Sequence, residues 1–167
     1  MEIRILKPDD KEELFSLIKV IEQTVKEKSF WLPIGDASRK HFFDREWTVF
    51  FGAFENQTLL GALGLFLNEN EYGESKKKLG IESNNIAEVG RAMCRPECRG
   101  KGVASALMNK LLEYVAGSNI EILLATVHPD NEPSQRLLRG FGFSKKGSIV
   151  KYRGYERDIM IRRMRRN

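Results

Sequence analysis

The chain has 167 residues, of which 41% are hydrophobic and 31% are charged, as in an ordinary soluble globular protein. This length predicts a single domain over residues 1–167 with one sizeable core. The net charge of +5 suits an anionic ligand, but much of it lies in 162–166 without interleaved aromatic residues, which disfavours nucleic-acid binding. No apolar run reaches the roughly 18 residues of a membrane span, and the acidic start is unlike a signal peptide, so we expect a cytoplasmic protein.

The first third of the chain predicts a strand, a helix and a short second helix. Residues 2–6 alternate as a strand does, and Asp9 is positioned to cap a helix whose apolar stripe extends to Val25. The apolar connection 30–34 (FWLPI) either packs on the core as a loop or forms a lid or wall of a substrate pocket. Residues 37–45 are expected to form the short helix.

A hairpin and a long polar segment follow. Residues 47–55 and 59–67 are aromatic- and leucine-rich strands on either side of Asn56-Gln57, which is a hairpin signal. Residues 68–85 are charged and contain glycine. We expect this segment to be either an excursion over the sheet or a mobile flap.

The stretch 86–117 is the one around which the chain is organised. Residues 86–94 form an apolar strand that is stopped by Arg95-Pro96, because proline has no N–H to pair. From Val103 to Val115 apolar residues recur every four positions, which indicates an amphipathic helix. The sequence therefore predicts a strand, a short glycine loop and a helix in direct succession.

The loop between that strand and that helix is a predicted anion site. Its two glycines let the backbone approach a ligand, the free N–H groups of the helix start point into the same space, and Arg99 and Lys101 add positive charge. A pyrophosphate suits this design. A Walker A loop is rejected because Gly102 follows Lys101 where Ser or Thr is needed. The dinucleotide fingerprint G-x-G-x-x-G nearly fits, with Ser105 in place of the third glycine.

The cysteines do not predict a metal site or a disulfide. Cys94 and Cys98 are the only cysteines, and the two histidines are far from them in the sequence. They make a poor ligand set, and an intracellular location disfavours a disulfide. We therefore expect no metal and two ordinary thiols, although Cys98 adjoins the anion loop and is a candidate reactive thiol.

The last part of the chain completes a mixed α/β pattern. Residues 120–127 are a continuous apolar strand of the kind that is buried in a parallel sheet. A short helix over 131–139 and strands over 143–151 and 155–162 follow, and Gly142 is expected to turn the chain with a positive φ. The predicted order is β-α-α-β-β-β-α-β-α-β-β.

Two motifs resemble the signatures of the GNAT superfamily of N-acetyltransferases. Arg99, Gly102 and Ala104 match Arg/Gln-x-x-Gly-x-Gly/Ala, which resembles the acetyl-CoA loop of that family. Asn131 opens a helix that ends in Gly142-Phe143 before a strand, which resembles the second signature. With the element order, the resemblance covers most of the chain. A dinucleotide-binding fold would not begin with two helices and a hairpin.

The resemblance implies a GNAT-like acyl-CoA N-acyltransferase fold, with acetyl-CoA as cosubstrate between two splayed parallel strands, here 86–94 and 120–127. It implies that Asn131 touches the pantetheine arm. The backbone of three strand residues would bond the same arm: Ala92, Met93 and Cys94. The pyrophosphate would be held by the loop and the helix start: Arg99, Gly100, Lys101, Gly102, Val103, Ala104 and Ser105.

Acetylation of an amine requires an uncharged nucleophile. An alkylammonium has a pKa of about 10.4, so roughly one molecule in a thousand is neutral at pH 7. Glu88 is the lone carboxylate inside an apolar strand, at the distance from the Arg99 loop where the histone-acetylating branch of the family carries its basic glutamate. We predict that Glu88 is the general base, acting through a water. The alternatives are a structural ion pair or an exposed strand start.

Arg91 is the other charged residue of this strand. Period-2 counting places it on the face opposite Glu88. Either a buried carboxylate pairs with it, or it anchors the carboxylate of an acceptor. A backbone N–H near Met93 is expected to support the oxyanion.

The sequence departs from the commonest family pattern at two positions. The tyrosine acid that many members carry seven residues beyond the Asn is Leu138 here, and Thr126 stands where the ribosomal-protein N-terminal acetylases carry a glutamate. A thiol pKa of about 8.5 makes the thiolate a tolerable leaving group without an acid. Tyr152 or Tyr155 could approach the sulfur instead, and His128 is either a second-choice base or plain loop.

These observations predict an N-acetyltransferase that moves acetyl from acetyl-CoA to a primary amine by direct attack. A small-molecule acceptor is favoured over a protein amine, and the protein is expected to be a monomer or homodimer. One alternative is a module of the same fold that binds CoA without catalysis, as sensor or scaffold. A nicotinamide-cofactor reductase is the other.

Overall fold

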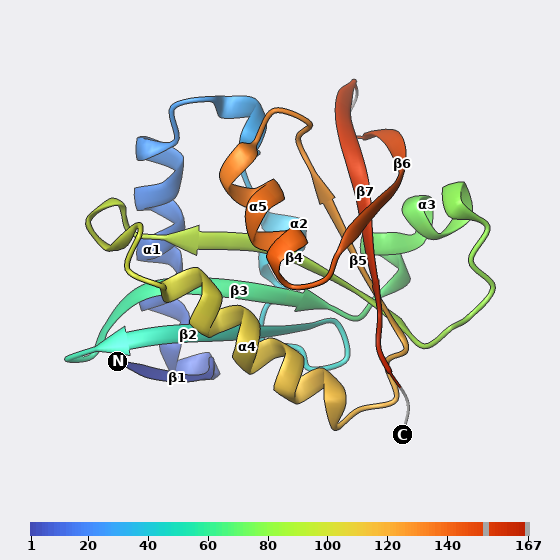
Figure 1. Ribbon diagram of the computed structural model, residues 1–167. Helices are drawn as coiled ribbons and strands as arrows, with labels where there is room; N and C mark the ends of the chain where they lie inside the picture. The colour runs from blue at the N-terminus through green and yellow to red at the C-terminus, as the bar shows by residue number, and fades with distance from the viewer. Residues whose placement is uncertain (152–153, 166–167) are drawn as a thin grey trace.

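Seven strands form one mixed sheet in the order β1-β2-β3-β4-β5-β7-β6 in the computed structural model, which describes residues 1–151 and 154–165 (Figure 1). The strands are β1 (Glu2–Ile5), β2 (Thr48–Glu55), β3 (Thr58–Phe66), β4 (Ile86–Cys94), β5 (Ile122–Val127), β6 (Ser144–Lys151) and β7 (Tyr155–Arg163). The helices are α1 (Lys11–Thr24), α2 (Asp36–Arg39), α3 (Glu69–Leu79), α4 (Val103–Ala116) and α5 (Glu132–Gly140). Short 3-10 turns span Pro8–Asp10, Lys28–Phe30 and Pro96–Cys98.

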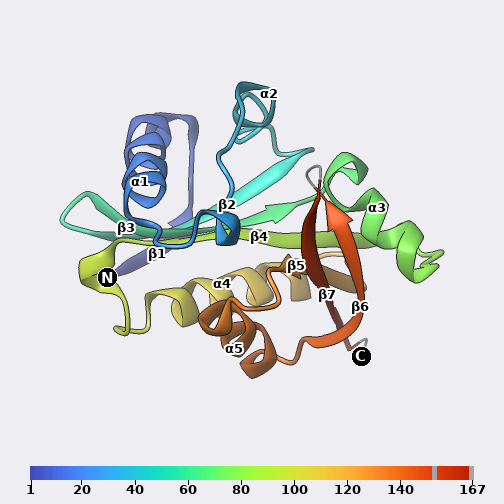
Figure 2. The ribbon, with the colours of Figure 1, turned by 90° about the horizontal axis from the view of Figure 1, so that it is seen from above.

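Helices cover both faces of the sheet, with α1 and α2 on one side and α4 and α5 on the other (Figure 2). The apolar stripe of α4, from Val103 to Val115, is buried against β2 and β3, as its four-residue spacing predicts. Leu14 and Leu17 of α1 are fully buried on the opposite face, against β3 and β4. The sheet is therefore a middle layer, with α4 packed on one face and α1 on the other (Figure 2).

The strands β4 and β5 are parallel and separate soon after they pair. Their register extends only from Ile86 opposite Ile122 to Glu88 opposite Leu124. Beyond this point β4 continues beside β3 and β5 continues beside β7. Because the two strands no longer pair, the backbone groups along their facing edges are available to a ligand. The predicted splay between 86–94 and 120–127 is thus confirmed.

A β-bulge in β4 reverses the prediction for Arg91. Gly64 lies opposite Gly90 and Ala62 lies opposite Met93, so β4 has one extra residue between these pairs. Arg91 sits in the bulge with φ +54°, a left-handed conformation.

The bulge places the Arg91 side chain on the Glu88 face. Its guanidinium lies 4.8 Å from the centre of the Trp31 ring. Trp31 packs on the α1-side cluster that also contains Met93 and Phe66, the β3 neighbour of Glu88. Period-2 counting was wrong here because it assumes an unbroken ladder.

The segment 68–85 is an excursion over the sheet, and it contains a helix that the sequence did not predict. Asn68 caps α3 by accepting a hydrogen bond from the N–H of Asn70, and Gly80 ends the helix with φ +65°. Tyr72 is buried with apolar residues of β4, β5 and β7, on the Glu88 face of the sheet. The helix has few apolar residues, and their stripe is too thin to reveal it in the sequence.

Most other predicted boundaries differ from the structure by about one residue, and two differ by more. The helix expected over 37–45 is reduced to α2, and turns follow it up to Trp47. The strand expected from residue 120 begins at Ile122. Neither difference moves a residue of the predicted anion site.

Candidate functional site

The loop before α4 has the geometry of an anion site. Gly100 and Gly102 have φ of +76° and +81°, and a Cβ at either position would meet nothing within 4 Å. Glycine is therefore favoured at these two positions by the left-handed backbone conformation, and not by lack of space for a side chain. The N–H of Ala106 donates to the carbonyl oxygen of Gly102 at 3.0 Å, so the amides of the preceding residues have no helical acceptor. The first turn of α4 has no acidic residue that would oppose an anion.

A cleft of about 890 Å³ is lined by the diverging strands β4 and β5, by the start of α4 and by α5. Its lining contains these predicted cofactor-binding residues: Ala92, Met93, Cys94, Arg99, Gly100, Gly102, Val103, Ala104, Ser105 and Asn131. Lys101 is exposed and lies outside the lining. The cleft therefore joins a helix N-terminus, which suits a diphosphate, to an unpaired strand edge, which suits the amides of a pantetheine arm. The residues present fit acetyl-CoA.

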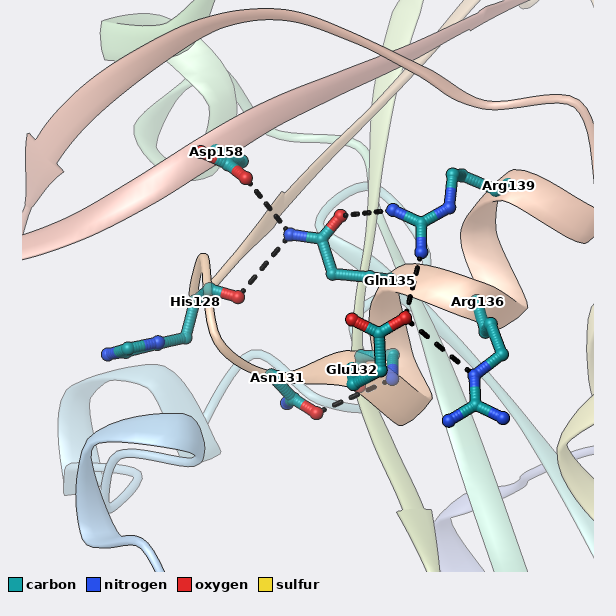
Figure 3. A network of polar contacts seen from close by, with 8 residues as sticks. His128, Asn131, Glu132, Gln135, Arg136, Arg139 and Asp158 are labelled. Carbon is teal, nitrogen blue, oxygen red and sulfur yellow. Dashed lines mark hydrogen bonds and ion pairs between the residues drawn. The ribbon is translucent and has the colours of Figure 1, made fainter.

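Asn131 is the N-cap of α5, as predicted, and its Oδ1 accepts a hydrogen bond from the N–H of Ser134 at 3.4 Å. The buried Gln135 fixes this helix end, because its Nε2 donates to Oδ2 of Asp158 on β7 at 3.0 Å and to the carbonyl oxygen of His128 at 3.4 Å (Figure 3). The turn that presents Asn131 to the cleft is thus held from behind by the sheet. Its contact with pantetheine stays a prediction.

Glu88 is buried, with 7% of its surface exposed, which excludes the exposed strand start. The pKa of Glu88 is raised to about 7, mainly by burial and also by the nearby charge of Glu71, while Lys151, a hydrogen bond from Thr126 and Arg91 act in the opposite direction. The charges of Lys151 and Arg91 favour its ionised form, so a structural ion-pair role stays an alternative to the base role. A carboxyl with this pKa accepts and releases a proton near neutral pH.

Thr126 lies between Glu88 and the cleft. Its hydroxyl donates to Oε1 of Glu88 at 3.3 Å, and Thr126 belongs to the cleft lining, whereas Glu88 does not. A proton from the cleft would therefore reach Glu88 through the Thr126 hydroxyl or a water beside it. From the sequence, Thr126 is recognisable only as a residue in place of a glutamate. The parallel pairing of Glu88 with Leu124 brings Thr126, two residues further along β5, beside Glu88.

The sequence model of the "Acetyltransferase (GNAT) family" matches residues 13–143. The chain belongs to this family. The YwnH protein of Bacillus subtilis strain 168, which has a provisional name as a phosphinothricin acetyltransferase, is 30% identical over 107 residues, 58% of this chain and 65% of its own length. The L-2,4-diaminobutyric acid acetyltransferase of Marinococcus halophilus is 36% identical over 61 residues, 36% of each chain.

The chain aligns with 31–65% of the length of its curated relatives. Among solved structures, yncA of Salmonella typhimurium, solved with its cofactor acetyl-CoA, has a TM-score of 0.75 at 15% identity, over 100% of this chain and 95% of that one. At this identity the likeness shows the fold alone, and it confirms the predicted GNAT-like architecture.

In this GNAT chain the position of the missing tyrosine acid is apolar: Leu138 is 6% exposed and belongs to the cleft lining. Tyr152 lies outside the described residues. Tyr155 is 40% exposed, and its ring centre is 5.7 Å from the Arg157 guanidinium. His128 lines the cleft, and its Nδ1 accepts a hydrogen bond from the N–H of Asp130 at 3.0 Å, which fixes the ring.

The two cysteines are poorly placed to be reactive thiols. Burial raises the pKa of the Cys94 thiol, which disfavours the thiolate, and Cys98 is 9% exposed. Among residues 1–151 and 154–165, no cluster of three His, Cys, Asp or Glu could hold a metal ion. In the same ranges, no helix is both long and apolar enough to cross a membrane.

The apolar connection 30–34 contributes to both the core and the cleft. Phe30 and Trp31 line the cleft, whereas Ile34 is buried in the α1-side cluster. The structure also adds Arg157, which the sequence reading overlooked: it is 5% exposed and lines the cleft. A signal was present, since Arg157 lies two residues before the apolar run 159–161 of the same strand.

Proposed function

We propose that this chain transfers the acetyl group of acetyl-CoA to a primary amine by direct attack, and that the acceptor is a small molecule. The observation that carries the proposal is Glu88, a buried carboxyl with a pKa of about 7. It accepts a hydrogen bond from the hydroxyl of Thr126, which lines the cleft, and the start of α4 at the other end of this cleft is suited to an anion. Family membership supports the reaction type.

The cosubstrate is acetyl-CoA. Its diphosphate fits the start of α4, where Gly100 and Gly102 shape the backbone, and its pantetheine arm fits the open edge of β4. The family relative yncA binds acetyl-CoA in its solved structure, which supports the assignment.

The reaction begins with loss of a proton from the acceptor ammonium through Thr126, or a neighbouring water, to Glu88. The neutral amine nitrogen then attacks the thioester carbonyl carbon, so a C–N bond forms and the C–S bond breaks. A backbone N–H in the bulged part of β4, near Met93, is placed to support the oxygen as it gains charge. The electron pair leaves with the CoA sulfur as thiolate, and the amide nitrogen releases its remaining extra proton to solvent.

A small acceptor is supported by the walls of the cleft and by the relatives. The large aromatic side chains of Phe30 and Trp31 line the cleft. One relative is named for L-2,4-diaminobutyric acid, which is a small amine. A cytoplasmic location and a monomeric or homodimeric state stay predictions from the sequence.

The test is Glu88→Gln, with the exposed Glu113→Gln of α4 as a matched control. A panel of amines is assayed with acetyl-CoA by release of free thiol, and acetyl-CoA affinity is measured by calorimetry. We expect Glu88→Gln to lower kcat about 10²- to 10⁴-fold at neutral pH, with partial recovery at high pH, while the Kd of acetyl-CoA stays within about twofold. Equal loss of rate and affinity would contradict the base role.

A second candidate function is a CoA-binding sensor or scaffold without catalysis, which the apolar Leu138 in the acid position favours. It predicts tight acetyl-CoA binding together with no amine acetylation by the wild-type protein. The same two measurements therefore separate it from the enzyme.

A further inference from the structure

The acceptor end of the cleft, defined by Phe30, Trp31, Arg91, Thr126 and Arg157, contains two guanidinium groups that hold one loop. Nη1 of Arg91 donates to the carbonyl oxygen of Leu32, and Nη2 of Arg157 donates to that of Ser29 at 2.6 Å. These carbonyl groups are three residues apart in the connection between α1 and α2. The two guanidinium groups are therefore brought to the same part of the cleft from different strands.

Both arginines are on the face of the sheet that carries Glu88. Ile159, two residues beyond Arg157 on β7, packs under α3 with Leu124, and Thr126 of the same face pairs with Ile159. Arg157 therefore projects to this face by the period of the strand. Arg91 reaches it through the bulge of β4, because its φ of +54° breaks the alternation. Such a conformation is rare outside glycine and tends to concentrate at functional sites.

The surroundings of the arginines suit an anionic group. The Arg91 guanidinium lies over the Trp31 ring, which holds its plane. Nε1 of Trp31 is buried without a hydrogen-bond partner among the described residues. A buried donor without an acceptor is costly, and a ligand oxygen at this end of the cleft would satisfy it.

The positive charge at this end of the cleft favours amines that also carry a negative group. Lys151 is buried on the same face, and its charge, like that of Arg91, acts on Glu88. Among the described residues that line the cleft, Glu27 is the one with a carboxylate, and it accepts hydrogen bonds from the N–H and hydroxyl of Ser29. An acceptor whose only charge is its ammonium is repelled by this set, whereas an acceptor that also carries a carboxylate is attracted.

We propose that the acceptor is a small amine that carries a carboxylate, an amino acid or a close analogue, and that Arg91 and Arg157 bind this carboxylate. The inference rests on the proposed function of the same cleft. A guanidinium presents several N–H groups in one plane, which matches the two oxygens of a carboxylate. With the carboxylate held there, the amine is directed toward Thr126 and Glu88.

The test compares each of a panel of L-amino acids with its own primary amide, which keeps the shape and removes the negative charge. We expect the wild-type protein to acetylate the preferred amino acid with a kcat/KM at least 10-fold above that of its amide. A preference for the amide, or for simple diamines, would overturn the proposal.

The variants are Arg91→Met and Arg157→Met, which keep an unbranched apolar stem and remove the guanidinium, with the exposed Arg45→Met as control. Loss of a charged hydrogen bond predicts a KM for the amino acid that rises about 10- to 100-fold, with little change for its amide. If the arginines only hold the loop at 29–32, both acceptors lose rate alike, and the proposal fails. Thermal unfolding of each variant reports whether the fold is kept.

A binding measurement makes failure of this proposal distinguishable from failure of the proposed function. Calorimetry with CoA present compares the N-acetyl form of the preferred amino acid with its amide, and it requires no turnover. Transfer from acetyl-CoA to amides or diamines, without preference for carboxylates, rejects the carboxylate and keeps the transferase. Absence of transfer to every amine rejects both.

Discussion

The two ends of the cleft are built in different ways. The cofactor end consists mainly of backbone: two glycines in left-handed conformation and the first amides of α4 lie within one short stretch of sequence. The acceptor end consists of side chains from β4, β5, β7 and the α1–α2 connection, which meet only when the sheet forms. A site made of local backbone can be read from a motif. A site made of distant side chains requires the topology.

The largest expected effect concerns Glu88 at the acceptor end. It is the change in the free energy of unfolding with pH. The folded-state pKa of Glu88, about 7, lies above the ordinary value of 4.5, so the folded state holds a proton that the unfolded state has lost between these two values. The free energy of unfolding therefore falls as pH rises from 4.5 to 7, by up to about 3 kcal/mol from this one group. Glu88→Gln removes this contribution.

The measurement is urea unfolding of wild type, Glu88→Gln and Glu113→Gln at intervals between pH 4.5 and 8. We expect the variant at position 88 to gain stability relative to wild type as pH rises, and the control to run parallel to wild type. The same ionisation predicts that kcat/KM of the wild type increases as pH rises through about 7. Parallel curves for all three proteins would show that Glu88 is not held in a neutral form.

The next effect tests the cofactor end. A β-branched residue at Gly102 must adopt φ +81°, at a cost of about 1–2 kcal/mol, or move the amides that face the ligand. We expect Gly102→Val to raise the Kd of acetyl-CoA at least about 10-fold in calorimetry. Gly35→Ala is the control, since Gly35 has φ −75° and open space for a Cβ. Equal affinity of both variants would mean that the loop backbone does not bind the diphosphate.

The sequence predicted the local backbone geometry of the cofactor end, and it did not predict the arrangement of side chains at the acceptor end. The Arg99 loop and the Asn131 cap depend on contacts within a few residues, and the structure has both as expected. The face of Arg91 was mispredicted because β4 has a bulge there. The bulge is defined by the register of β4 against β3, which the sequence of β4 alone does not contain. The helix α3 was missed because its polar sequence is stabilised by a few buried contacts, such as that of Tyr72 with the sheet.

The smallest effect concerns Asn131, where structure and binding overlap. Asn131→Ala loses the cap and is expected to lower the free energy of unfolding by about 1 kcal/mol, whereas Asn131→Asp keeps a capping oxygen and stays near wild type. Asn68→Ala is a matched control, because it removes the cap of α3, whose residues do not line the cleft.

If Asn131 also contacts pantetheine, only the alanine variant at position 131, and not the one at position 68, weakens acetyl-CoA binding in calorimetry. If both alanine variants lose stability and neither loses affinity, Asn131 is a cap alone. The backbone of the cofactor end would then account for acetyl-CoA binding without this side chain, and the contrast between the two ends of the cleft would be sharper.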